Sequence, residues 1–124
     1  MGADDTVIIQ DLVAARAAKR VSNNIVEKLR QANQLYTLGN KVEAKQAYSE
    51  LEKQIWGMQK SRIEYACALE CCATLARMGH ERESYLILFA EYEEEAVNTQ
   101  SLSLQEVENI RYRQFKSRRF NLML

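Results

Sequence analysis

Apolar residues recur at helical spacing through most of the chain, most clearly between Ile25 and Gly57. The apolar residues in the first half of this stretch lie three or four positions apart: Ile25, Leu29, Ala32 and Tyr36. An α-helix has 3.6 residues per turn, so this spacing puts them on one face. Polar residues fill most positions between them. The pattern predicts an amphipathic helix that ends near Gly39.

A second helix is expected to return from Gly39 to Gly57. Its apolar face is made of small and large residues: Ala44, Ala47, Tyr48, Leu51 and Ile55. This mixture lets two helices approach closely and interdigitate. Glycine suits both ends, because it adopts the left-handed conformation after a helix without a Cβ penalty. The stretch therefore predicts an antiparallel helical hairpin.

The rest of the chain predicts further helices with recognisable ends. They cover Val7–Val21, Arg62–Met78, Glu81–Val97 and Leu104 to about Arg119. Ser61 with Glu64, and Ser103 with Glu106, have the spacing of a capping box at a helix start. The helix from Arg62 is apolar nearly all round, which is typical of a helix buried between neighbours. We expect it to be the central helix of the core.

The boundary between the first two helices depends on Ser22, Asn23 and Asn24. All three are poor interior helix formers that favour turns and caps. Asn24 has Glu27 three residues later, the spacing of a capping box. We therefore predict a break here. A single long helix through this point is the alternative.

Two sets of residues in these hairpins resemble the tetratricopeptide (TPR) motif. The first set is Ala32, Leu35, Gly39, Ala44, Tyr48 and Leu51. The second follows forty residues later: Cys72, Leu75, Gly79, Ser84 and Leu88. Ser84 departs from the alanine of the motif, and the offset exceeds the ~34-residue period of tandem TPRs. The resemblance covers about residues 25–96.

This resemblance implies a right-handed array of antiparallel hairpins with a concave groove for a peptide or helix; a general helical bundle is the alternative architecture. The groove residues that it implies are Val26, Leu29, Asn33, Tyr36 and Thr37, followed by Leu69, Ala73 and Ala76. This set is mostly apolar. The ligand would then be an apolar helix or peptide, or the protein's own terminal helix.

Composition favours one all-α domain of five to six helices over residues 1–124. It would comprise a short leader (1–5), the TPR-like core (25–96), and a basic helix with an apolar tail (103–124). Proline is absent, and 17 Lys and Arg balance 17 Asp and Glu. No apolar run approaches the ~18 residues of a membrane span. Three cysteines, two of them adjacent, favour free thiols and a reducing, cytoplasmic location.

Candidate catalytic and metal-binding groups are weak. Cys67 and Cys71 share one helical face and His80 follows, but a zinc site needs about four ligands. Small core hydrophobes are the better interpretation. The acidic run Glu91–Glu95 predicts a solvated face, or a docking patch for the basic C-terminal segment. We expect no cofactor and no enzymatic activity.

The C-terminal segment interleaves basic and aromatic residues. They are Arg111, Tyr112, Arg113, Phe115, Lys116, Arg118, Arg119 and Phe120. Such a pattern suits a partner or self-association segment, single-stranded nucleic-acid binding, or simply a closing amphipathic helix with a basic solvent face. Zero net charge weakens the nucleic-acid interpretation.

The preferred interpretation is a non-catalytic protein–protein interaction module: an adaptor, complex subunit or small chaperone that binds an apolar helix or peptide. We also expect that it can pair with a second copy. The alternative is a nucleic-acid-binding or regulatory helical protein that uses the basic, aromatic segment. Salt separates the two, because phosphate contacts weaken steeply as salt rises.

Overall fold

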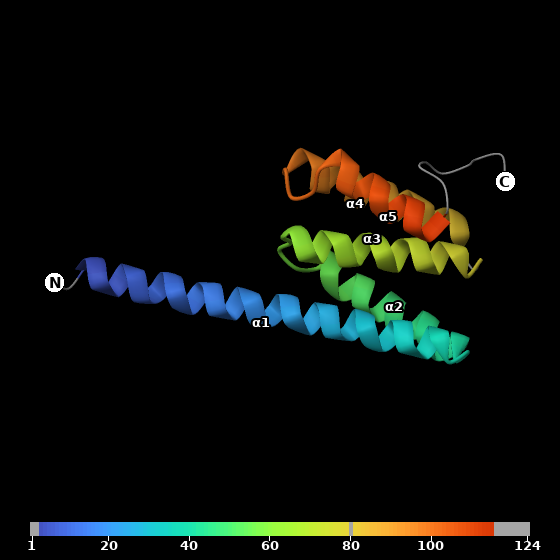
Figure 1. Ribbon diagram of the computed structural model, residues 1–124, viewed down its shortest axis with the longest axis horizontal. Helices are drawn as coiled ribbons and strands as arrows, with labels where there is room; N and C mark the ends of the chain where they lie inside the picture. The colour runs from blue at the N-terminus through green and yellow to red at the C-terminus, as the bar shows by residue number, and fades with distance from the viewer. Residues whose placement is uncertain (1–2, 80, 116–124) are drawn as a thin grey trace.

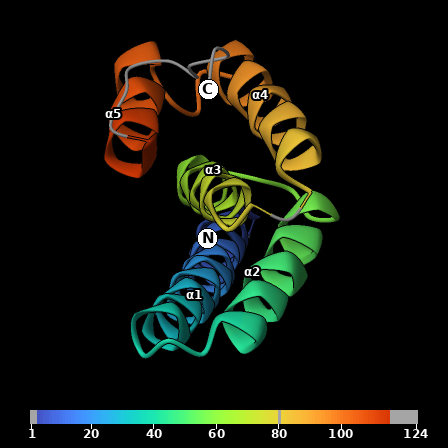
Figure 2. The same ribbon diagram turned by 90° about the vertical axis from the view of Figure 1, so that its right-hand side faces the viewer.

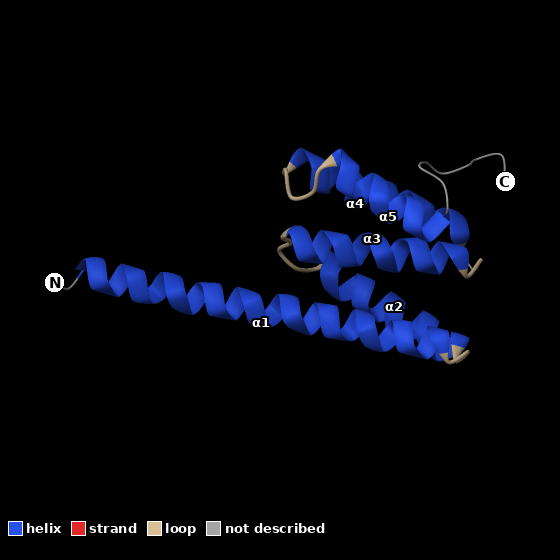
Figure 3. Cartoon of the chain, in the orientation of Figure 1, coloured by secondary structure: helices blue, strands red, loops and turns tan. Residues whose placement is uncertain are grey.

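The apolar pattern folds into five helices within residues 3–79 and 81–115, the part that the computed structural model describes. These are α1 (Ala3–Thr37), α2 (Lys41–Trp56), α3 (Arg62–Arg77), α4 (Arg82–Asn98) and α5 (Leu104–Phe115). Figure 3 shows helices and loops, and no strand, over those residues. The predicted all-α class is confirmed. No helix in the described ranges combines the length and hydropathy of a transmembrane span.

The predicted break at Ser22–Asn24 is wrong, because α1 is one helix of 35 residues. Ser22 donates a hydrogen bond to the Glu64 carboxylate of α3 at 2.6 Å, and Ile25 is fully buried. Glu27 pairs with Arg30 at 3.2 Å instead of forming a capping box with Asn24. Low helix propensity costs only a few tenths of a kcal/mol per residue, so tertiary packing outweighs it. The expected leader is also shorter, since α1 begins at Ala3.

Two of the predicted glycine turns have the expected left-handed backbone. Gly39 has φ +86° and Gly79 has φ +85°. The amide of Asn40 donates to the carbonyl of Leu35 at 3.0 Å, which closes the end of α1. Gly57 also follows a helix, but its φ of −85° lies in a region that any residue adopts. Only the first two turns therefore require glycine.

Both predicted capping boxes form. Glu64 accepts a hydrogen bond from the amide of Ser61 at 2.8 Å, and α3 begins at the next residue. Glu106 accepts one from the amide of Ser103 at 3.1 Å and donates its own amide to the Ser103 hydroxyl at 3.1 Å. These bonds satisfy amides that have no partner inside the helix.

The helix α3 is the centre of the fold, as predicted. It contacts all four other described helices. Figure 2 shows α1 and α2 on one side of α3, and α4 and α5 on the other. Seven of its side chains are fully buried: Ala68, Leu69, Cys71, Cys72, Ala73, Leu75 and Ala76. Small residues there allow the neighbouring helices to approach closely.

The core also contains a buried polar pair between α2 and α4. Tyr92 donates a hydrogen bond to the Glu52 carboxylate at 2.7 Å, and both residues are buried. Burial, together with this bond, raises the pKa of Tyr92 far above its ordinary value. The edge of the Trp56 ring meets Tyr92 with centroids 5.6 Å apart. A buried carboxylate needs such a partner, because an unpaired one costs several kcal/mol.

Candidate interaction surface

The five α1 residues predicted to face a partner groove differ in exposure. Leu29 and Tyr36 are half-buried and pack against the core. Val26 is 38% exposed, and Asn33 and Thr37 are exposed polar residues. α1 therefore presents an apolar edge bordered by polar side chains, which is narrower than the continuous apolar groove that the resemblance implies.

One of these residues is tied to the hairpin interior. Tyr48 on α2 is buried, and its hydroxyl donates a hydrogen bond to Asn33 Oδ1 at 2.5 Å. Burial raises the pKa of Tyr48 to about 12, with a further rise from the nearby Cys71 and Tyr36. The phenol therefore stays protonated near neutral pH and holds Asn33 in place.

Tyr36 also lines a hollow of about 260 Å³ where α1 ends, α2 begins and α3 ends. The lining combines apolar and cationic side chains: Tyr36, Lys41, Val42, Lys45, Arg77 and Met78. Val42 is 83% exposed, so its side chain is outside the core. The ammonium groups of Lys41 and Lys45 have no carboxylate partner among the described residues. The hollow thus offers apolar contacts beside uncompensated positive charge.

The C-terminal helix α5 is attached by ion pairs, and the most buried of them involves Arg111. Its side chain is 8% exposed and pairs with Glu93 on α4 and with Glu108 on α5. The guanidinium lies 5.6 Å from the ring centroid of Phe89. Arg111 was predicted for a partner surface, but the structure places it inside the protein. Among the described residues, Glu93 of the acidic run thus receives Arg111 of the basic segment within the same chain.

A second set of polar bonds joins α5 to α3. Arg113 pairs with Glu70, which also accepts a hydrogen bond from Gln114 Nε2 at 3.2 Å. Arg77 in turn donates to Gln114 Oε1 at 2.8 Å. Arg113 is 61% exposed, so this ion pair is solvated and weaker than that of Arg111. Because Arg77 also lines the Tyr36 hollow, this set connects α5 to that site.

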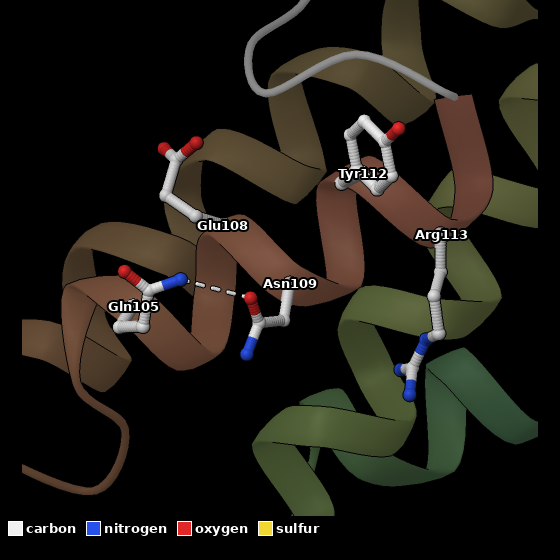
Figure 4. Close-up of a pocket in the computed structure, with 5 residues that line it drawn as sticks. All are labelled: Gln105, Glu108, Asn109, Tyr112 and Arg113. Carbon is white, nitrogen blue, oxygen red and sulfur yellow. Dashed lines mark hydrogen bonds between the residues drawn. The ribbon is translucent and has the colours of Figure 1, made fainter.

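One side of α5 carries the described remainder of the basic, aromatic segment, with Arg113 directed toward α3 (Figure 4). Gln105, Glu108, Asn109, Tyr112 and Arg113 line a shallow hollow of about 370 Å³ there. Gln105 donates to Asn109 Oδ1 at 2.9 Å, and Tyr112 is 53% exposed. Tyr112 and the ion-paired Arg113 are thus accessible to solvent. These two residues are a small part of the predicted binding segment.

The remaining predicted site residues fall into two groups. Phe115 is half-buried, with its ring edge against Phe89 at 6.4 Å between centroids. Lys116, Arg118, Arg119 and Phe120 lie outside the described residues.

The prediction that Leu69, Ala73 and Ala76 face an open groove is wrong, because all three are fully buried. They lie on α3, which other helices contact on both sides, so no peptide can reach them in this fold.

The cysteines of α3 have the character of core residues. Cys67, Cys71 and Cys72 are buried free thiols. Burial raises the pKa of Cys67 to about 11, and it raises the pKa of Cys71 and Cys72 above their ordinary values. A thiol is a nucleophile or metal ligand only as a thiolate, so these environments disfavour both roles. No metal-binding group of three or more His, Cys, Asp or Glu occurs among the residues described.

The residues that line the hollow together with Tyr36 were not predicted from the sequence. Lys41 and Lys45 are one turn apart on α2, whereas Arg77 and Met78 come from the end of α3. The interval from Lys41 to Lys45 places both on one helical face, a signal that was available. The approach of α3 to the α1–α2 turn gives no sequence signal, because it depends on how the hairpins stack.

In comparisons with known proteins, no family model, curated protein or solved structure matches the chain.

Proposed function

We propose that this protein is a non-catalytic protein–protein interaction module that binds an apolar helix or peptide. The site is the hollow lined by Tyr36, Val42 and Met78, where α1 ends, α2 begins and α3 ends. Such a module acts as an adaptor, a complex subunit or a small chaperone. The ligand is an apolar segment that also carries acidic side chains, since Lys41, Lys45 and Arg77 border the same hollow.

The exposure of Val42 is the observation that carries the proposal. The β-branched apolar side chain of Val42 is 83% exposed beside a hollow. A partner that covers it removes apolar surface from water, which stabilises the complex. Leu38, in the turn between α1 and α2, is 75% exposed. Aromatic and apolar anchors with a charged rim are typical of protein interfaces.

The helix order supports a TPR-like arrangement. α1 with α2, and α3 with α4, are consecutive hairpins, and α3 contacts both helices of the first hairpin. In such an array the ends of the hairpins are accessible even where the central helix is covered. The Tyr36 hollow is at such an end.

Point variants test the proposal better than truncation, because α5 contributes the buried Val107, Ile110 and Arg111. The experiment is affinity capture from nuclease-treated native lysate with wild type and Val42→Asp. We expect a discrete protein partner that wild type retains and Val42→Asp loses. The purified partner should then bind the isolated protein at one site by calorimetry.

Ile87→Asp on α4 is the matched control, because Ile87 is also an exposed apolar residue, 62% accessible, on a different helix. It should retain the partner. Equal loss in both variants, or no loss in Val42→Asp, would contradict the proposed site. Recovery of nucleic acid in place of protein before nuclease treatment, with release at high salt, would favour the nucleic-acid alternative.

We also propose a reducing, cytoplasmic location for the module. The three free thiols, buried in α3, support this, because unpaired cysteines are typical of proteins in reducing compartments.

A further inference from the structure

The N-terminal half of α1 projects beyond the other helices (Figure 1). α1 has 35 residues and α2 and α3 have 16 each, so they are about 52 Å and 24 Å long at 1.5 Å per residue. α1 joins the bundle near Ser22, which bonds to Glu64 at the start of α3. The preceding residues Arg16, Lys19 and Arg20 are exposed.

The projecting segment has an apolar sequence. It contains Ile8, Ile9, Leu12 and Val13, together with four alanines at positions 14, 15, 17 and 18. In proteins most of the stability of a helix comes from packing of its apolar face against a neighbour. Alanines allow a second helix to approach closely. The segment therefore has the composition of one half of a helix pair.

The charges along the segment indicate which helix would be its partner. Asp4 and Asp5 are at its start, and Lys19 and Arg20 are near its end, with Leu12 midway between residues 3 and 21. In an antiparallel pair centred on Leu12, Asp5 is level with Lys19 of the second copy and Asp4 is level with Arg20. A parallel pair would place acid beside acid and base beside base, which is repulsive.

A hollow of about 490 Å³ lies where α1 leaves the bundle, at the level of the partner helix's end. Its lining is Val21, Ser22, Met58, Gln59, Lys60, Ser61 and Glu64, and the Glu64 carboxylate there already accepts hydrogen bonds from Ser22 and Ser61. Val21 is 44% exposed. In the antiparallel pair, the first turn of the second copy's α1 is level with Val21. The acidic positions 4 and 5 of that helix are then close to the level of the hollow that Lys60 lines.

We propose that two copies of this chain form a closed two-fold dimer by antiparallel pairing of residues 3–21 of α1. The same surface serves both copies, so the contact closes on itself and does not propagate into a filament. The dimer joins two bundles at their N-terminal helices and leaves the Tyr36 hollow of each copy free. The inference is therefore independent of the proposed peptide site.

Charge reversal in the full-length chain tests the proposal by sedimentation equilibrium over a concentration series. Wild type should reach twice the mass of one chain. Asp4→Lys with Asp5→Lys, and separately Lys19→Glu with Arg20→Glu, should each raise the dimer dissociation constant by at least about tenfold. All four substitutions together should restore dimerisation, because opposite charges again face each other.

The control is Arg30→Glu with Arg82→Glu, the same charge change at two exposed positions outside residues 3–21 and outside the Tyr36 hollow, which should leave the dissociation constant unchanged. Circular dichroism should show that every variant keeps its helix content. A monomeric wild type, or reversal variants that dimerise as wild type does, would overturn the proposal. So would a monomer that binds anionic lipid vesicles through Lys19 and Arg20, since the segment would then be a membrane-surface helix.

Discussion

Arg111 on α5 forms an ion pair with Glu93 on α4, at a site where the arginine side chain is only 8% exposed. The same guanidinium lies over the ring of Phe89 and also reaches Glu108. The pair fixes α5 to α4 on the side of the fold away from α1. A residue typical of a partner surface thus stabilises the protein itself.

Replacing Arg111 by Met should lower the free energy of unfolding by about 3 kcal/mol, because Glu93 then loses its partner in a poorly solvated site. Urea denaturation followed by circular dichroism measures the change. Arg113→Met is the matched control: this arginine also pairs with a glutamate but is 61% exposed. It should cost no more than about 1 kcal/mol. Equal effects in the two variants would show that burial does not govern the Arg111 pair.

Gly39→Ala should destabilise the protein by about 1–2 kcal/mol, because an L side chain is strained at φ +86° even where space is available. Gly57→Ala is the comparison. Its φ is −85° and an added Cβ would lie 3.8 Å from the nearest atom, an ordinary contact. The free energy of unfolding of Gly57→Ala should differ from that of wild type by less than about 0.5 kcal/mol. Thermal and urea denaturation of both variants check this difference, and a neutral Gly39→Ala would contradict the turn geometry.

The three native thiols should resist alkylation by iodoacetamide at mildly alkaline pH until the protein is unfolded. Burial raises the pKa of Cys67 from 9.0 to about 11, which lowers its thiolate fraction about a hundredfold. Mass spectrometry counts the alkyl groups with and without denaturant. The variant Gln59→Cys supplies an exposed thiol as the positive control, because Gln59 is exposed. Labelling of Cys67 as rapid as that of the introduced thiol, in the folded variant, would be the contrary result.

Ser22→Ala should lower the free energy of unfolding more at neutral pH than at acidic pH. Burial acts to raise the pKa of Glu64, but hydrogen bonds from Ser22 and Ser61 outweigh it and lower that pKa below the ordinary 4.5. A carboxyl with a lowered pKa stabilises the fold above its unfolded-state value, and this stabilisation is lost as pH falls through the folded-state pKa. The cost of Ser22→Ala should therefore be about 1 kcal/mol at neutral pH. It should shrink at acidic pH, as the pH falls below the ordinary pKa of 4.5.

Urea denaturation at both pH values measures this, and NMR titration should show the pKa of Glu64 rising in Ser22→Ala. Ser49→Ala is the control, since no carboxylate of a described residue accepts a hydrogen bond from Ser49. A cost of Ser22→Ala that does not depend on pH would mean that the hydroxyl acts through packing alone.

Local sequence signals predicted the helices and most of their ends. Gly39, Gly79 and the two capping boxes act within one turn of the chain, so their effect can be inferred from neighbouring residues. The uniformly apolar pattern of α3 likewise predicted its central position, because a helix without a polar face must be covered on all sides.

Tertiary structure decided what local propensity left open. α1 continues through Ser22–Asn24, where the Ser22–Glu64 bond and the buried Ile25 outweigh weak helix propensity. Stacking of the hairpins buried Leu69 and Ala73 and brought Arg77 to the Tyr36 hollow. Arg111 became internal because α5 packs against α3, from where its guanidinium reaches Glu93 on α4. Each outcome depends on contacts between residues far apart in the chain, and the spacing of residues within one helix carries no information about them.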